Sequence, residues 1–341
     1  MYEIDITSKE KEVAMKLGKA THAVLDRSVF KNIKIRRKDV LNRPQIGLDA
    51  NGVTLQQGAD VLTSTATITG HGNFVPITAV YRAINSIYAS GAKPVGMTVS
   101  LTIPRKFEES TIKEWMKLID KIGAQHEVDV LGGQTTISDG VIEAVLTINA
   151  LGVQNSNEGK AKKFAQANQT ILLANPIGLE GTIRLAEMKF EELNSRYTKT
   201  FISNGDAEHI DLSLKGVYEA LKDKEELYLH DVAEGGIFGA LWELSVRLNC
   251  GFDIDLKKIP MRQETIEFCE FYDLNPYMLV SGGCMLIVTS NPEEIIRSLE
   301  AGNIPVVAIG NVSSSNDKII HNEDEIRYLE PSKGDQIYKV L

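Results

Sequence analysis

Cysteine is scarce in this sequence. Cys250, Cys269 and Cys284 are its three cysteines among 341 residues, and no two of them form a Cys-x-x-Cys pair. An odd and widely spaced set argues against a disulfide framework and against a structural zinc site. Because unpaired, infrequent cysteines are typical of a reducing compartment, we expect a cytoplasmic protein whose cysteines are small buried side chains.

Long apolar runs and an excess of positive charge are also missing. The most apolar stretches, 141–151 and 304–309, are too short or too polar to cross a bilayer, and residues 1–5 do not begin a secretory signal. The 37 Lys and Arg residues are outnumbered by 46 Asp and Glu residues, which gives a formal net charge of −9. We therefore predict that the protein binds no nucleic acid and no membrane.

Several common catalytic signatures do not occur. The sequence has no Gly-x-x-x-x-Gly-Lys-Ser/Thr phosphate loop and no Gly-x-Gly-x-x-Gly fingerprint. It also has no Gly-x-Ser-x-Gly elbow and no His-Glu-x-x-His pair. These absences argue against P-loop nucleotide hydrolases, Rossmann-type dinucleotide enzymes, serine hydrolases of the α/β class and zinc metalloproteases.

Helical and strand patterns alternate through both halves of the chain, which predicts a mixed α/β (α+β) fold. The polar segment 154–163 is the best linker, so we predict two domains, residues 1–157 and 158–341. Apolar residues at helical spacing predict helices at 8–26, 76–89, 109–126, 181–193, 212–221, 234–248 and 292–299. Other patterns predict extended structure at 44–69 and strands at 95–103, 128–131, 141–153, 170–174, 226–229, 285–288, 305–309 and near 319 and 326.

Three glycine-containing turns each follow a predicted strand. They lie at 131–136 (Leu-Gly-Gly-Gln-Thr-Thr), 175–182 (Asn-Pro-Ile-Gly-Leu-Glu-Gly-Thr) and 230–236 (His-Asp-Val-Ala-Glu-Gly-Gly). Glycine lets the backbone approach a ligand closely, and the N–H groups at the start of a following helix can hold an anion. The turns therefore favour a phosphate-bearing ligand.

The carboxylates in these turns allow two interpretations. Asp231 and Glu234 have the spacing of a helix N-cap and its capping-box partner, and Glu180 suits the first turn of a helix. The same side chains could instead serve a metal, a phosphate or acid–base chemistry. The spacing alone leaves both interpretations open.

Taken in this order, the three turns resemble the aminoimidazole ribonucleotide synthetase-related superfamily. Residues 230–243 resemble its His-Asp-x-Thr-Glu-Gly-Gly block, residues 85–94 its Asn-Asp-x-x-x-x-Gly-Ala-x-Pro helix end, and residues 132–135 its Gly-Gly-Glu/Asp/His-Thr segment. The likeness extends from about residue 10 to residue 330. It is greatest for the hydrogenase-maturation dehydratase branch, which carries Gly-x-Glu-Gly-Thr as at 178–182.

The resemblance implies an N-terminal domain that pairs with a second copy in a barrel, which makes a homodimer, and a C-terminal α/β domain beside it. It implies ATP between the domains, with magnesium, in ATP-dependent activation or phosphoryl transfer. By the same resemblance Asp231 and Glu234 are the candidate catalytic residues and Asp49 the candidate metal ligand. The implied cofactor-binding residues are Asp49, Asn85, Ser86, Gly132, Gly133, Gln134, Thr135, Gly178, Glu180, Gly181, Thr182, Gly235 and Gly236.

The sequence departs from the family where metal ligands are expected. Thr65 and Ala66 lie in the strand that carries a family Asp, Ser86 replaces the Asp of Asn-Asp, and Gln134 replaces an acid or His. The last cysteine is Cys284, so we do not expect the C-terminal thiocarbamoylation of the maturation enzyme. Two hypotheses remain: an ATP-dependent enzyme with an altered metal site, and a degenerate nucleotide- or metabolite-binding relative that acts as a sensor or partner subunit.

Overall fold

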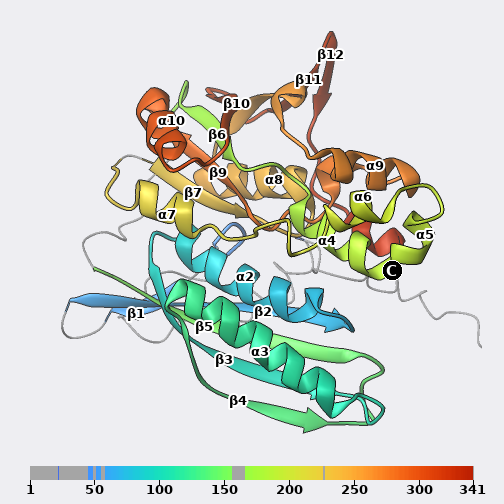
Figure 1. The fold of residues 1–341 in the computed structure, drawn as a ribbon. Helices are drawn as coiled ribbons and strands as arrows, with labels where there is room; N and C mark the ends of the chain where they lie inside the picture. The colour runs from blue at the N-terminus through green and yellow to red at the C-terminus, as the bar shows by residue number, and fades with distance from the viewer. Residues whose placement is uncertain are drawn as a thin grey trace, which may run out of the picture.

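Two β-sheets divide the described chain between them, one below and one above the helix α2 in Figure 1. The computed structural model describes residues 22, 45–48, 51–54, 58–155, 166–225 and 227–340. Strands and helices alternate within both parts, so the predicted mixed α/β fold is confirmed. None of the described helices is both long and apolar enough to cross a bilayer.

The first sheet has the strand order β1-β2-β5-β3-β4. Its neighbours are antiparallel except for the parallel pair β3 and β4. In β2, Leu62, Ala66 and Ile68 are buried while the threonines between them are exposed, so only one face is covered. The elements of this part are β1 (Asn51–Thr54), β2 (Ala59–Gly70), α2 (Phe74–Ala89), β3 (Lys93–Ile103), α3 (Glu109–His126), β4 (Asp129–Ile137) and β5 (Ala144–Asn155).

The second sheet has the strand order β12-β11-β8-β10-β6-β9-β7. Its strands are β6 (Thr170–Ala174), β7 (Leu227–Val232), β8 (Gly251–Asp255), β9 (Cys284–Thr289), β10 (Val306–Ser313), β11 (Lys318–Asn322) and β12 (Glu325–Tyr328). Its helices are α4 (Leu179–Met188), α5 (Phe190–Leu193), α6 (Lys199–Ser203), α7 (Lys215–Leu221), α8 (Gly236–Leu248), α9 (Gln263–Phe271) and α10 (Pro292–Ala301). Three 3₁₀ turns, η3 (Leu256–Lys258), η4 (Pro276–Met278) and η5 (Gln336–Lys339), complete it.

Alternation along β6 shows how the layers are stacked. Ile171 and Leu173 pack in one apolar cluster with α8, whereas Leu172 and Ala174 pack in another with α7, α10 and the first sheet. The helix α2 belongs to this second cluster and contacts β2 and β5 as well as β7, α4 and α7. One apolar core therefore runs from the first sheet through α2 to the second sheet.

Most predicted elements are present, with different ends. The predictions for α3 and β6 are confirmed at both ends, whereas the helix expected at 181–193 is divided into α4 and α5. Neither β8 nor α9 was predicted. The predicted helix at 8–26 lies outside the described residues apart from His22, which is helical, and residues 156–163 of the predicted linker also lie outside them. The domain boundary at 157 stays a prediction.

The interpretation of Gly132 and Gly133 as a turn after a short buried strand is wrong. Both glycines lie within β4, which continues to Ile137 and is exposed at the edge of its sheet. A Cβ atom on Gly133 would lie 1.9 Å from the carbonyl oxygen of Val99. This glycine therefore permits the close approach of β4 to β3, which explains it without a turn.

Candidate functional site

One face of α2 meets the turns of the C-terminal half. Asn85 is buried there, where its Nδ2 donates to Leu212 O at 2.7 Å and its Oδ1 accepts from Leu214 N at 3.1 Å. One position along, Ser86 Oγ lies 3.3 Å from Asp231 Oδ2. Asn85 thus fixes the position of α2, and Ser86 places a hydroxyl beside the carboxylate of Asp231.

The turn at 230–236 has a different geometry from the predicted capping box. Asp231 lies inside β7, and the N-cap of α8 is Gly235, so the interpretation of Asp231 as N-cap with Glu234 as its partner is wrong. Gly235 and Gly236 have φ values of +88° and +64°. A Cβ atom on Gly236 would lie 2.5 Å from Tyr277 O, so both the backbone angle and the close approach require glycine.

The turn at 175–182 is tightly packed. A Cβ atom on Gly181 would lie 2.4 Å from Leu279 Cγ, and Gly178 has a φ of +75°. Thr182 Oγ1 donates to Gly178 O at 2.8 Å and lies 2.7 Å from Thr265 Oγ1. Packing and turn geometry therefore account for Gly178, Gly181 and Thr182, and their role in cofactor binding stays a prediction.

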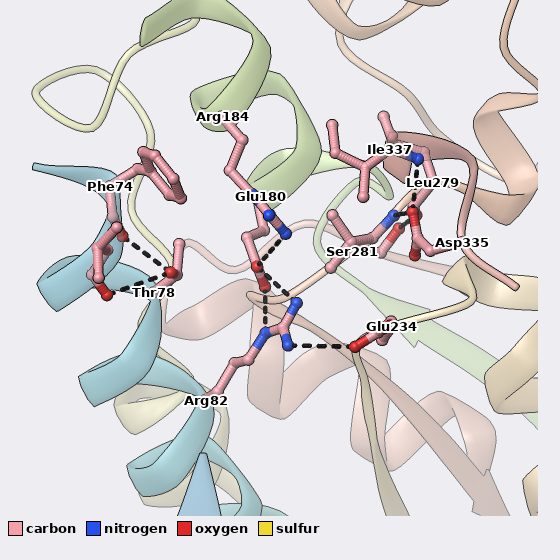
Figure 2. Close-up of polar contacts among 12 residues, drawn as sticks. Phe74, Thr78, Arg82, Glu180, Arg184, Glu234, Leu279, Ser281, Asp335 and Ile337 are labelled. Carbon is pink, nitrogen blue, oxygen red and sulfur yellow. Dashed lines mark hydrogen bonds and ion pairs between the residues drawn. The ribbon is translucent and has the colours of Figure 1, made fainter. Parts of the chain in front are cut away.

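A buried ion-pair cluster joins α2 to both turns (Figure 2). Arg82 Nε and Nη2 donate to the two carboxylate oxygens of Glu180 at 2.9 and 2.7 Å, and Arg82 Nη1 lies 3.6 Å from Glu234 Oε2. Burial lowers the pKa of Arg82, but the Glu180 and Glu234 carboxylates outweigh burial and raise it overall. The guanidinium is therefore charged and fixed between the two acids.

Arg184 adds a second guanidinium to the cluster from α4. Its Nη1 lies 3.8 Å from Glu180 Oε1, and its guanidinium carbon lies 5.3 Å from the centre of the Phe74 ring. Its Nε is buried and has no hydrogen-bond partner. We call Arg82, Glu180, Arg184 and Glu234 the junction cluster.

Asp335 closes the other side of the third turn. Its carboxylate accepts the backbone N–H groups of Gly235 at 2.7 Å, Val280 at 3.2 Å and Ile337 at 2.9 Å. Burial raises the pKa of Asp335 to about 6 although these three hydrogen bonds act in the opposite direction. A side chain from the C-terminal segment thus occupies an N–H group at the start of α8.

The predicted site residues fall into three groups. Ser86, Glu180, Asp231, Glu234 and the glycines of the last two turns come together at the junction. Residues Gly132 to Thr135 lie apart on the edge strand β4, where Gln134 Nε2 donates to Thr136 Oγ1 at 3.1 Å. Asp49 lies outside the described residues.

Sequence reasoning missed Arg82, Arg184 and Asp335. Arg82 is four residues before Ser86, so the two share a helix face, and this spacing was the available signal. Arg184 follows Glu180 at the same spacing. Nothing local to the sequence indicated that Asp335 reaches Gly235.

The described residues do not suit a magnesium ion. Magnesium prefers several carboxylate, phosphate and water oxygens in octahedral geometry. Among residues 58–155, 166–225 and 227–340, no three His, Cys, Asp or Glu side chains gather where they could hold a metal. Two carboxylates of the junction, Glu180 and Glu234, instead share the charge of Arg82.

A separate cavity of about 1050 Å³ lies between the two helices of the first sheet and the segment 183–215. It is lined by Ile77 and Tyr81 of α2, among others, and by none of the junction cluster. His126 lies at its edge, where Tyr88 OH is 3.1 Å from Nδ1. Burial, followed by the charge of Lys215, lowers the pKa of His126 to about 4, so this histidine is neutral and structural at pH 7.

Known proteins share this architecture. The chain is 24% identical over 295 residues to a putative hydrogenase expression/formation protein of Methanocaldococcus jannaschii, and the match covers 83% of each chain. Crystal structures of HypE have a similar fold. Escherichia coli HypE has a TM-score of 0.71 at 16% identity over 82% of this chain and 88% of the other. Hydrogenase maturation protein HypE in complex with ATP has a TM-score of 0.64 at 14% identity over 93% and 96% of the two chains.

Family models match both parts of the chain. Residues 48–154 match the N-terminal domain of AIR synthase related protein, and residues 166–322 match its C-terminal domain. AIR is aminoimidazole ribonucleotide, so the family is the one that the three turns resemble. The chain belongs to the AIR synthase-related family.

Proposed function

We propose that this protein binds ATP at the junction of α2 with the turns that precede α4 and α8, and uses it to activate or phosphorylate a small substrate. The observation that carries the proposal is the meeting of Ser86 and Asp231, 3.3 Å apart, beside the junction cluster. Support comes from the similar fold of HypE, which has been crystallised in complex with ATP.

The chemistry assigned to each residue follows from its surroundings. Asp231 is buried next to the Ser86 hydroxyl, so its carboxylate is placed to orient a hydroxyl or amide group of a substrate. Glu234 lies partly open to solvent at the edge of the cluster, where it can accept a proton from a reacting group. Asn85, Gly178, Gly181, Thr182, Gly235 and Gly236 are proposed as the frame of the nucleotide site, and Gly132 to Thr135 as contacts supplied from β4.

We also propose a homodimer formed through the first sheet. Threonines of β2 at positions 63, 65, 67 and 69 are exposed on the face opposite the core. The edge strand β4 exposes the large apolar side chain of Leu131. A second copy placed on this face would cover both, and it would bring a second β4 toward the site. Sedimentation equilibrium of the full chain tests this proposal, and a monomer at all concentrations contradicts it.

A second candidate function is nucleotide binding without turnover. It is favoured by one observation: two carboxylates of the junction, Glu180 and the candidate catalytic residue Glu234, are engaged by Arg82. In this role the chain would be a nucleotide sensor or a partner subunit. Three buried cysteines, none in a disulfide, are consistent with the further proposal that it works in the cytoplasm.

Calorimetric titration of the protein with ATP, followed by assay of the same samples for ADP, tests both candidates. Saturable binding with ADP release supports the enzyme, and binding without ADP supports the sensor. Asp231→Asn should weaken binding or abolish ADP release, whereas Asp223→Asn at an exposed turn should change neither. No binding of ATP would contradict the proposed function in both forms.

A further inference from the structure

The acidic side chains of the junction cluster already have a cation. Arg82 binds both oxygens of Glu180, at 2.9 and 2.7 Å, and lies 3.6 Å from Glu234. A divalent metal ion would need the same oxygens, because carboxylates are the ligands that it prefers. Arg82 is supplied by α2 and the two carboxylates by the second part of the chain, so this cation also joins the halves.

Arg184 contributes a guanidinium with one buried donor, Nε, that has no hydrogen-bond partner. Its side chain is 5% exposed, and its nearest carboxylate oxygen, Glu180 Oε1, lies 3.8 Å from Nη1, which is too long for a hydrogen bond. Since a buried donor without an acceptor is unfavourable, its presence points to an acceptor that a ligand brings.

The side chains of the junction cluster differ in how far they are exposed to solvent. Glu180 is fully buried, Arg184 is 5% exposed, and Arg82 and Glu234 are 15% and 14% exposed. Burial, and then the charge of Glu234, raises the pKa of Tyr338 in the C-terminal segment to about 12, so this phenol lies close to the cluster. Arg82 and Glu234 thus form the more exposed side of the cluster, and Arg184 and Glu180 its more buried side.

We infer that the junction is an oxyanion site built from guanidinium groups. Phosphate oxygens of the nucleotide accept hydrogen bonds from Arg184, while Arg82 pairs with Glu180 and Glu234 in place of a metal ion, so that binding needs no divalent cation. Guanidinium groups suit this role because they bind phosphate oxygens through two parallel hydrogen bonds. The inference rests on the proposed function and specifies how the phosphates of that nucleotide are held.

The same arrangement explains Ser86. A carboxylate at position 86 would lie next to Asp231 and add a negative charge that no metal compensates. A neutral hydroxyl at this position still contacts Asp231, with Oγ 3.3 Å from Oδ2. Ser86 thus keeps a further negative charge away from Asp231, one helical turn after Arg82.

Titration calorimetry with ATP in excess EDTA and in excess magnesium chloride tests this inference. The wild-type dissociation constants in the two buffers should agree within about threefold, and Arg184→Gln should weaken binding in EDTA by about tenfold or more, as expected for a lost charge-assisted hydrogen bond. Arg184→Lys keeps the positive charge but not the planar guanidinium, so its dissociation constant for ATP should lie between those of wild type and Arg184→Gln. Arg196→Gln, at an arginine that is half exposed and lies 3.5 Å from Glu270, is the matched control and should bind as wild type.

Binding that disappears in EDTA, or that Arg184→Gln leaves unchanged, would overturn the inference while leaving the proposed function intact. If ATP does not bind in either buffer, the proposed function and the phosphate-binding role of Arg184 both fail, and thermal unfolding in manganese chloride then tests only whether Arg82 takes the place of a metal ion. Arg82→Gln, which frees the two carboxylates, should gain stability from manganese, whereas wild type should not. If manganese stabilises wild type to the same extent as the variant, Arg82 does not take the place of a metal ion.

Discussion

The carboxylate of Asp335 accepts the backbone N–H of Gly235 at 2.7 Å, although the two residues are 100 positions apart in the sequence. Gly235 is the N-cap of α8, so its N–H belongs to the group that a helix leaves without internal partners. The C-terminal segment thereby completes the turn that carries Asp231 and Glu234.

The first prediction concerns the pH dependence that Asp335 causes. Its pKa rises from 3.8 to about 6, mainly through burial, so between these values the folded protein binds the proton more tightly than the unfolded chain. The stability that this residue contributes therefore falls as the pH rises from 4 to 6. Asp335→Asn removes the effect, so the free energy of unfolding of the variant relative to wild type should rise by up to about 3 kcal/mol across this range.

Urea unfolding of the two proteins at pH 4, 5, 6 and 7 measures this difference. The Asp317→Asn variant, at an exposed acid, serves as the control and should show a constant difference from wild type. A difference for Asp335→Asn that is independent of pH, or that falls as pH rises, would contradict the prediction.

The second prediction concerns the energy of the Arg82–Glu180 pair. Arg82→Met leaves the fully buried carboxylate of Glu180 without its bidentate partner, and we expect a loss of about 3 kcal/mol in the free energy of unfolding. The double variant Arg82→Met/Glu180→Leu removes both charges and should recover most of that loss. A double-mutant cycle from urea unfolding measures the coupling, and additive losses would show that the pair is not coupled.

The third prediction compares two glycines that differ in their surroundings. Gly236→Ala places a Cβ atom 2.5 Å from Tyr277 O at a φ of +64°, so we expect a loss of at least about 2 kcal/mol in stability. A Cβ atom on Gly132 meets nothing within 4 Å, so Gly132→Ala should change stability by about 0.5 kcal/mol or less. Thermal unfolding measures both stability losses. A larger loss for Gly132→Ala than for Gly236→Ala would contradict the prediction.

The fourth prediction concerns the thiols. Burial raises the pKa of Cys250 to about 11 and that of Cys269 to about 12, and it raises that of Cys284 well above its usual value. Thiolates are the reactive form, so Ellman's reagent at pH 8 should label the native protein slowly and label three thiols at once in guanidinium chloride. Rapid labelling of a native thiol would contradict this prediction.

Local sequence patterns predicted much of the fold because they report local burial. The apolar residues of α3 repeat at helical spacing and β6 is a short apolar run, so both were predicted with their observed ends. The glycines at 132 and 133 were mistaken for a turn because their role depends on β3, which is distant in the sequence. Asp231 was open to a capping interpretation because the spacing did not show that β7 continues through it.

The candidate site was predictable only in part, for the same reason. The three turns and the helix end at 85–94 could be identified by their residues, and the resemblance placed them in one family. Arg82, by contrast, has meaning only beside Glu180, which is 98 residues away, and this pairing depends on how α2 packs between the sheets. Long-range ion pairs of this kind have no signature in a single sequence.

The apolar core that continues through α2 has a consequence for how the protein can be divided. Family models match two separate segments, which suggests two modules that evolution could exchange. In this chain, however, α2 packs in the same cluster as β6 and β9 of the second sheet. Neither segment produced alone would cover the apolar surface of α2 or of β6, so both should be insoluble when expressed separately and should recover solubility when expressed together. We therefore expect the two matched segments to unfold in a single cooperative transition.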